Sequence, residues 1–318
     1  MFYDLIHQFR AIRRSQNLLK HLGQGGRGVH RHPSQASMTF SSPSPDSIFN
    51  APDADVILRS DDAHPIDFKV HRCILVAGSP FFQTVFSLPQ PKSTTDDPVP
   101  VLDVAETSAI LDPFLRFLYP VPDPELPTLD ALVPIMSTAA KYDMTAVMDR
   151  LRRLLVSPAF LETAPVRVFA IASRFDLEEE AKTASKHTLR VRVLDVPLCD
   201  DLRHISAYSY HRLLELHRRR GEAARQALCA PPEDLRCMQC NGAQRFNAIA
   251  PPRWWAEFAT RAGEELRSRP TTDVIFSLKF LMHSAHASGC ARCAGSILES
   301  YLFLDALKAK IDALPSTI

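Results

Sequence analysis

Two short segments read as β-strands, residues 55–59 and the alternating residues 66–70, and they run directly into an apolar helical turn at residues 73–77. The polar stretch between the two segments has turn chemistry, so the pair predicts a β-hairpin. Ser79 can cap a further helix, and Pro80 suits its first position. A hairpin followed at once by two helices predicts a fold of the α+β class for this part of the chain.

The rest of the chain reads mainly as helix. Residues 89–98 are polar and proline-rich and predict a loop, and residues 99–103 predict a short strand whose proline favours a sheet edge. Apolar residues then recur with helical spacing. The helices that we expect cover residues 108–118, 129–142, 144–155, 165–175, 177–194 and 206–228. Beyond residue 157 no segment has a convincing strand pattern, which predicts an all-α C-terminal region.

The hairpin and the helices after it carry a recognisable set of residues. The set comprises Asp55, Val56, Phe68, His71, Arg72, Leu75, Ser79, Phe81 and Phe82. In this order and spacing the set resembles the signature of the BTB/POZ domain family. Residues 114–119 and 139–142 are similar to two later helix ends of that family. The resemblance implies a small sheet flanked by helices over residues 46–156, followed by helical regions at 157–228 and 229–318.

The resemblance also implies a function. BTB/POZ domains commonly bind other proteins and form homodimers through their first helices and the segment leading into the domain. We therefore expect a non-enzymatic adaptor that homodimerises and binds a further protein. Many such domains recruit a cullin through an acidic residue ahead of the Lys-Tyr helix end, but the corresponding residues 131–134 contain no acid. This departure argues against cullin recruitment.

Individual signature residues have two readings. By resemblance, Asp55 and Arg72 correspond to a charged pair in the peptide-facing groove of BTB dimers. The alternative, which stays open, is that they form an ion pair that only stabilises the fold. His71 is expected to be structural, because no second relay residue accompanies it. Phe81 and Phe82 are expected in the core.

A narrower resemblance reaches past the domain. Residues 53–60, 119–126 and 175–181 are similar to an expanded group of BTB proteins in mushroom-type fungi.

The net charge and the cysteine count indicate which partners and which cellular compartment to expect. The formal net charge is +1, which argues against nucleic acid or a membrane surface as a partner, and the odd count of seven cysteines favours a reducing compartment, cytoplasm or nucleus. Residues 1–45 read as a disordered basic extension with a Ser/Pro linker. Their first 37 residues hold six basic residues against one acid, so a mitochondrial targeting segment is the alternative.

Four of the cysteines form two Cys-x-x-Cys pairs, Cys237 with Cys240 and Cys290 with Cys293. This spacing lets two thiolates reach one tetrahedral ion, which predicts one structural zinc. The interval of 49 residues between the pairs is long, but an antiparallel helical hairpin within it would return its ends to one place. The alternatives are unligated thiols, a site that uses Cys229, His283 or His286 as substitute ligands, or a disulfide arrangement, against which a reducing compartment argues.

Motifs of catalysis are missing from the sequence. There is no glycine-rich phosphate loop, serine elbow or zinc-protease motif, so we do not expect an enzyme. The acidic residues 178–180 suit a helix N-terminus, and the basic residues 217–220 suit a helical face. The competing functional hypothesis is a zinc-stabilised nucleic-acid-binding regulator that uses the BTB domain only to dimerise.

Overall fold

The computed structural model describes residues 48–88, 99–229, 235–241 and 250–318. The predicted hairpin is confirmed: β1 (Val56–Arg59) pairs antiparallel with β2 (Asp67–Val70), with Val56 opposite Val70. The third strand, β3 (Val101–Asp103), pairs parallel with β1, which gives the order β2-β1-β3 among the described residues. The predicted strand at residues 99–103 therefore lies at a sheet edge, whereas the loop predicted at 89–98 and the basic extension at 1–45 lie outside the described residues.

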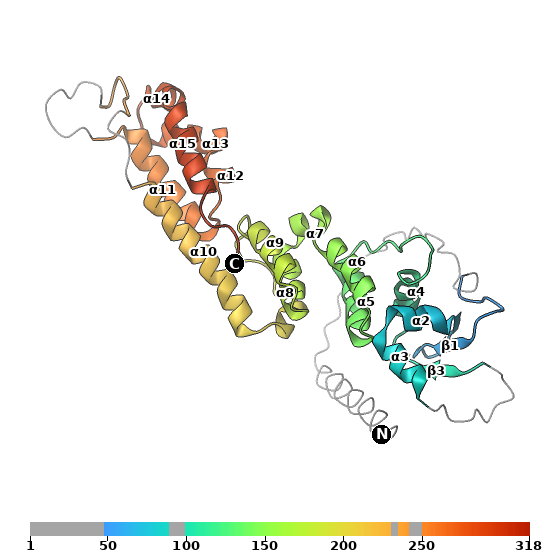
Figure 1. Cartoon of the computed structure of the whole chain (residues 1–318). Coiled ribbons are helices and arrows are strands. Elements are labelled where there is room, and N and C mark those ends of the chain that lie inside the picture. The colour runs from blue at the N-terminus through green and yellow to red at the C-terminus, as the bar shows by residue number, and fades with distance from the viewer. Residues whose placement is uncertain (1–47, 89–98, 230–234, 242–249) are drawn as a thin grey trace, which may run out of the picture. The chain divides into compact units, whose positions relative to one another are not determined.

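Helices follow and flank the strands in this part of the molecule (Figure 1). They are α2 (Arg72–Gly78), α3 (Pro80–Ser87), α4 (Ser108–Arg116), α5 (Leu129–Lys141) and α6 (Thr145–Leu155). Ser79 caps α3 as predicted, because its hydroxyl accepts the N–H of Phe82 at 3.1 Å. Helix α4 is capped from another segment, because the side chain of its own N-cap residue Thr107 makes no capping hydrogen bond. The carboxylate of Asp62, in the hairpin turn, accepts the N–H of Ser108 at 2.8 Å.

The core of this part lies between the sheet and these helices. The signature residues Val56, Phe68, Leu75 and Phe82 are all buried. Phe81 is only partly buried and packs against the same core, so its expected core position is confirmed in part. The apolar residues of the signature therefore hold the fold and leave little of their surface for a partner.

A helical region follows directly. It contains α7 (Pro158–Thr163), α8 (Pro165–Arg174), α9 (Glu178–Thr188), the 3-10 helix η2 (Asp200–His204) and α10 (Ala207–Ala227). Helix α8 is buried along most of its length, and its side chains join the core cluster that begins at Phe49. The cluster ends with Leu213 of α10, so the first half of α10 belongs to this cluster.

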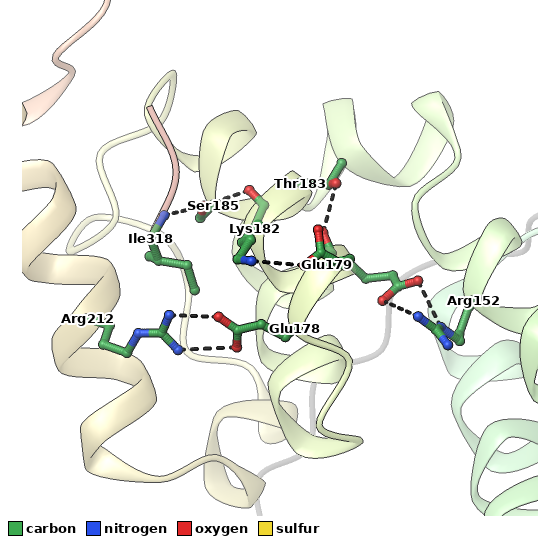
Figure 2. Close-up of polar contacts among 9 residues, drawn as sticks. Arg152, Glu178, Glu179, Lys182, Thr183, Ser185, Arg212 and Ile318 are labelled. Carbon is green, nitrogen blue, oxygen red and sulfur yellow. Dashed lines mark hydrogen bonds and ion pairs between the residues drawn. The ribbon is translucent and has the colours of Figure 1, made fainter. Parts of the chain in front are cut away.

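Helix α9 is held by its acidic first turn, which confirms the predicted helix N-terminus (Figure 2). Arg152 of α6 pairs with Glu180, and Arg212 of α10 pairs with Glu178, each at 2.8 Å. The side chain of Glu180 is only 12% exposed, so this turn is not simply solvated. This acidic turn joins α9 to α6 and to α10.

The C-terminal region forms a second buried cluster that starts at Ala224 of α10. Its helices are α11 (Arg253–Ser268), α12 (Thr272–Ile275), α13 (Leu278–Ala287), α14 (Cys293–Glu299) and α15 (Tyr301–Asp312). Helices α10 and α11 pack on each other, and α11 packs on α13 (Figure 1). The expected helical hairpin is confirmed, although its second leg breaks after Ile275 and restarts at Leu278, where Ser277 provides a new cap.

Two neighbouring residues of α10 set this packing. A Cβ at Gly221 would lie 2.8 Å from the carbonyl oxygen of Leu266 in α11, so only glycine allows this approach. Arg220, 6% exposed, donates to the carbonyl of Pro270 at 2.9 Å and to those of Ile311, Leu314 and Pro315. Burial lowers the pKa of this guanidinium. In the described part of the chain, no helix has the length and apolar character needed to cross a membrane.

We expect Phe82→Ala to lower the free energy of unfolding by about 3 to 5 kcal/mol, because it hollows a closely packed core. The ring of Phe82 is 1% exposed and lies 5.0 Å from the ring of Tyr142, centroid to centroid. Chemical denaturation measures the loss, with the exposed neighbour Gln83→Ala as the control. Equal stability of the two variants would contradict this packing.

His217 predicts a loss of stability as the pH falls. Its Nε2 lies 3.0 Å from the hydroxyl oxygen of Thr188, and burial lowers its pKa to about 4, from an ordinary value of about 6.5. Between these values the unfolded chain binds a proton that the folded chain does not. The free energy of unfolding therefore falls by up to about 1.4 kcal/mol per pH unit as the pH drops through this window.

The comparison uses His217→Gln, which cannot titrate but keeps an N–H for Thr188. Between pH 7 and pH 5, wild-type protein should lose about 2 kcal/mol more than this variant in urea denaturation. His211→Gln, at an exposed position on the same helix, is the matched control and should behave like wild type. If all three proteins lost stability equally, His217 would not be buried in its neutral form.

Candidate functional site

The junction between β2 and α2 is organised around His71. Its backbone N–H donates to the hydroxyl of Tyr119 at 2.8 Å, and its ring Nδ1 lies 3.1 Å from the same oxygen. Its Nε2 lies 3.4 Å from a carboxylate oxygen of Asp53. Burial raises the pKa of Tyr119, and the N–H of His71 partly offsets this. These contacts tie the hairpin to the segment after α4, which is a structural arrangement.

The side chain of Asp55 contacts the backbone of Arg72 and not its guanidinium. The carboxylate of Asp55 accepts the backbone N–H of Arg72 at 2.6 Å. The guanidinium of Arg72 turns toward the end of α3, where it lies 4.7 Å from the ring centroid of Phe86 and donates to the carbonyl of Phe86. Both side chains belong to exposed residues. They form a polar surface at the start of α2.

A buried polar network, which the sequence did not reveal, lies at the end of α5. Tyr142 donates its hydroxyl to Glu106 at 2.6 Å, and the ammonium of Lys141 donates to the other oxygen of Glu106 at 2.7 Å. Ser79 donates to the carbonyl of Tyr142 at 2.5 Å. Burial and the nearby carboxylate raise the pKa of Tyr142. The Lys-Tyr pair was visible as part of the resemblance, but nothing in the sequence marked Glu106 as its acceptor.

The four cysteines of the two Cys-x-x-Cys pairs come together, as the hairpin geometry predicted. All four sulfur atoms lie within 4.8 Å of one another. The Sγ atoms of Cys237 and Cys290 are 3.7 Å apart, and those of Cys240 and Cys293 are 3.8 Å apart. A tetrahedral ion with metal–sulfur bonds of about 2.3 Å needs sulfurs about 3.8 Å apart. The cluster has the right dimensions to hold one metal ion.

Buried polar side chains support both halves of the cluster. Asn241 accepts the N–H of Cys237 at 2.5 Å and donates to two carbonyls, so it fixes the first Cys-x-x-Cys turn. Ser296 of α14 donates to the carbonyl of Arg236 at 2.6 Å and accepts the indole N–H of Trp254 at 2.9 Å. The turn, α14 and α11 are therefore joined around the four sulfurs. Of the residues that build this cluster, only the cysteines could be recognised from the sequence.

The thiols differ in their acidity. For Cys237, burial opposes ionisation, but N–H groups of the turn and the neighbouring thiols bring its pKa to about 7. Burial raises the pKa of Cys240 and brings that of Cys293 to about 12. Among the described residues, neither Cys229, His283 nor His286 belongs to the cluster, so none of them replaces a cysteine.

Comparison with known proteins agrees with this geometry. A family model described as the BTB/POZ domain matches residues 49–158, which contain the sheet, helices α2–α6 and every signature residue. No curated protein matches the chain, so the narrower resemblance to proteins of mushroom-type fungi stays a prediction. The chain carries a BTB/POZ fold, a small three-stranded sheet flanked by helices, followed by a helical C-terminal region.

Proposed function

We propose that this protein is a non-enzymatic adaptor that homodimerises through residues 49–158 and binds a further protein. The observation that supports the proposal best is the BTB/POZ match over that range, since such domains are generally protein-interaction modules. A reducing compartment, cytoplasm or nucleus, is part of the same proposal. Cullin recruitment is not, because residues 131–134 lack the acid and are buried or half-buried in α5.

The segment leading into the domain supports the dimer. The carbonyl of Phe49 accepts the N–H of Lys69 at 2.9 Å, and Asn50 forms a parallel bridge with Lys69. This segment therefore extends the sheet beside β2. Helices α2 and α3 carry exposed residues, among them Arg72, Gln83 and Thr84. The resemblance assigns the dimer interface to these two elements.

We further propose that Cys237, Cys240, Cys290 and Cys293 bind one structural zinc ion. Their sulfur spacing fits a tetrahedral ion, and four thiolates leave no open position for catalysis. Cys237 and Cys293 are buried, so the ion would sit inside the second cluster and fasten the Cys237 turn to α14. A structural zinc ion is compatible with an adaptor and equally with a nucleic-acid-binding regulator. The net charge of +1 gives little support to nucleic-acid binding.

We expect a homodimer at micromolar concentration. Light scattering should give about twice the chain mass of 35.6 kDa. Cross-linking of mixed isotope-labelled and unlabelled chains should then place links between copies within residues 49–158. A monomer throughout, or a dimer without links in this range, would contradict the proposed interface.

We expect about one zinc ion per chain in protein purified without a histidine tag, measured by elemental analysis. Cys240→Ser should lose most of the zinc and destabilise the C-terminal helices, because structural zinc contributes directly to folding. The matched control is Cys229→Ser, which changes an exposed cysteine outside the cluster and should keep its zinc. Metal-free wild-type protein with four freely alkylated thiols would exclude the site, and iron in place of zinc would overturn the identity of the metal.

A further inference from the structure

Thiols from the two Cys-x-x-Cys motifs lie against each other in the cysteine cluster. The Sγ atoms of Cys237 and Cys290 are 3.7 Å apart, and those of Cys240 and Cys293 are 3.8 Å apart. The sulfurs of a disulfide lie about 2.05 Å apart, so each of these pairs needs an approach of only about 1.7 Å. The spacing that suits the ligands of one ion therefore also suits disulfide bonds that join one motif to the other.

Other side chains hold the two motifs beside each other. Ser296 of α14 donates its hydroxyl to the carbonyl of Arg236, the residue before Cys237, at 2.6 Å. The same hydroxyl accepts the indole N–H of Trp254 in α11 at 2.9 Å. None of these hydrogen bonds uses a metal ion. We therefore expect the thiols to stay within reach of one another when an ion leaves.

The two thiols of the pair Cys240 and Cys293 differ in their access to solvent. Cys240 is partly exposed, whereas Cys293 is 0% exposed. A small oxidant in solution can therefore reach Cys240 first. The neighbouring Cys293 is shielded from the oxidant but lies close enough to react with an oxidised sulfur on Cys240. A thiol that is accessible and has a second thiol beside it is typical of a reversibly oxidised site.

We propose that hydrogen peroxide converts the cluster into disulfides between the two motifs, Cys240 with Cys293 and Cys237 with Cys290, and thereby releases the metal ion. The release of metal rests on the proposed zinc site, whereas the disulfides rest on the sulfur geometry alone. In a reducing compartment the thiols are reduced at rest, so the disulfides form only under an oxidant and are reversed by thiol reductants.

One molecule of peroxide is consumed for each disulfide. The sulfur of Cys240 attacks a peroxide oxygen, the O–O bond breaks, and the hydroxide that leaves takes a proton from solvent and becomes water. Cys240 is then a sulfenic acid, and the peroxide has been reduced. The sulfur of Cys293 attacks the sulfur of Cys240, the S–O bond breaks, and hydroxide leaves with a further proton as a second water. The other pair reacts in the same way with another peroxide.

A disulfide between the motifs replaces the connection that the ion would provide. Cys240 lies in the turn that precedes α11, and Cys293 is the first residue of α14. A bond between their sulfurs joins the same two segments as the ion. A disulfide within one motif would not do so, because both of its sulfurs belong to one segment. Oxidation should therefore remove the ion and keep the two segments joined.

The test uses full-length wild-type protein that is treated with hydrogen peroxide, alkylated and digested with trypsin without reduction. Trypsin cleaves after lysine and arginine, so it leaves the first motif in one peptide, residues 237–245. It cleaves the second motif after Arg292, which gives peptides 280–292 and 293–308. Mass spectrometry should detect 237–245 linked to both of the other peptides. Links only between 280–292 and 293–308, with a closed ring in 237–245, would overturn the proposal.

Zinc in the same samples is measured with a chromogenic chelator, and about one ion per chain should be released as the disulfides form. The matched control is Cys229→Ser, which removes an exposed cysteine outside the cluster and should change neither the disulfides nor the release. Protein that keeps its zinc and its four reduced thiols under peroxide would overturn this inference and leave the zinc site standing. Zinc-free protein that forms the same disulfides would refute the zinc site and support the disulfides.

Thermal melting followed by circular dichroism tests whether the disulfides replace the ion. Protein stripped of zinc by a chelator should melt at a lower temperature than protein that has lost its zinc to peroxide, because only the second keeps a bond between the segments. Dithiothreitol followed by zinc should return the oxidised protein to its original melting temperature. Equal melting temperatures of the stripped and oxidised proteins, or a loss that dithiothreitol does not reverse, would contradict the proposal.

Discussion

The side chain and carbonyl of Tyr142 hold the BTB part of the molecule together. Its hydroxyl donates to the buried carboxylate of Glu106, its carbonyl accepts the hydroxyl of Ser79, and its ring packs against Phe82. The backbone carbonyl of Glu106 in turn accepts the N–H of Asp61 in the hairpin turn. One residue at the end of α5 thus connects the hairpin turn, the segment after β3 and the start of α3. A buried carboxylate is costly unless it is paired, and here Tyr142 and Lys141 both satisfy it.

A buried cation, Arg220, has the corresponding role in the C-terminal region. Arg220 has no carboxylate in direct contact among the described residues and is satisfied by four carbonyls instead. These carbonyls lie just after α11 and at the end of α15, so the guanidinium joins both of these segments to α10. Gly221 beside it permits the close approach of α11. Hydrogen bonds to backbone carbonyls fix the position of a chain segment more directly than a surface ion pair does.

Local chemistry made much of this structure predictable. The hairpin follows from two strand segments around a polar turn, the α3 cap follows from Ser79 and Pro80, and the cysteine cluster follows from two short spacings and one helical hairpin. Long-range polar pairing was not predictable. Glu106 and Tyr142 are 36 positions apart, and Asp62 caps a helix that begins 46 positions later. No periodicity encodes such partners, because each depends on the packing that brings them together. The break before Leu278 was not predicted either, although Ser277 offers a local cap signal there.

The proposed zinc ion would act on a helix that has few other anchors. Cys293 is the first residue of α14, and Ser296 in the same helix already anchors it to Arg236 beside Cys237. A helix as short as α14 has little stability of its own in water, so its order depends on such anchors. An ion bound by Cys293 and Cys237 would join the same two segments a second time. The BTB part has a buried cluster of its own, so loss of the ion should loosen α14 and the Cys237 turn before it affects that part.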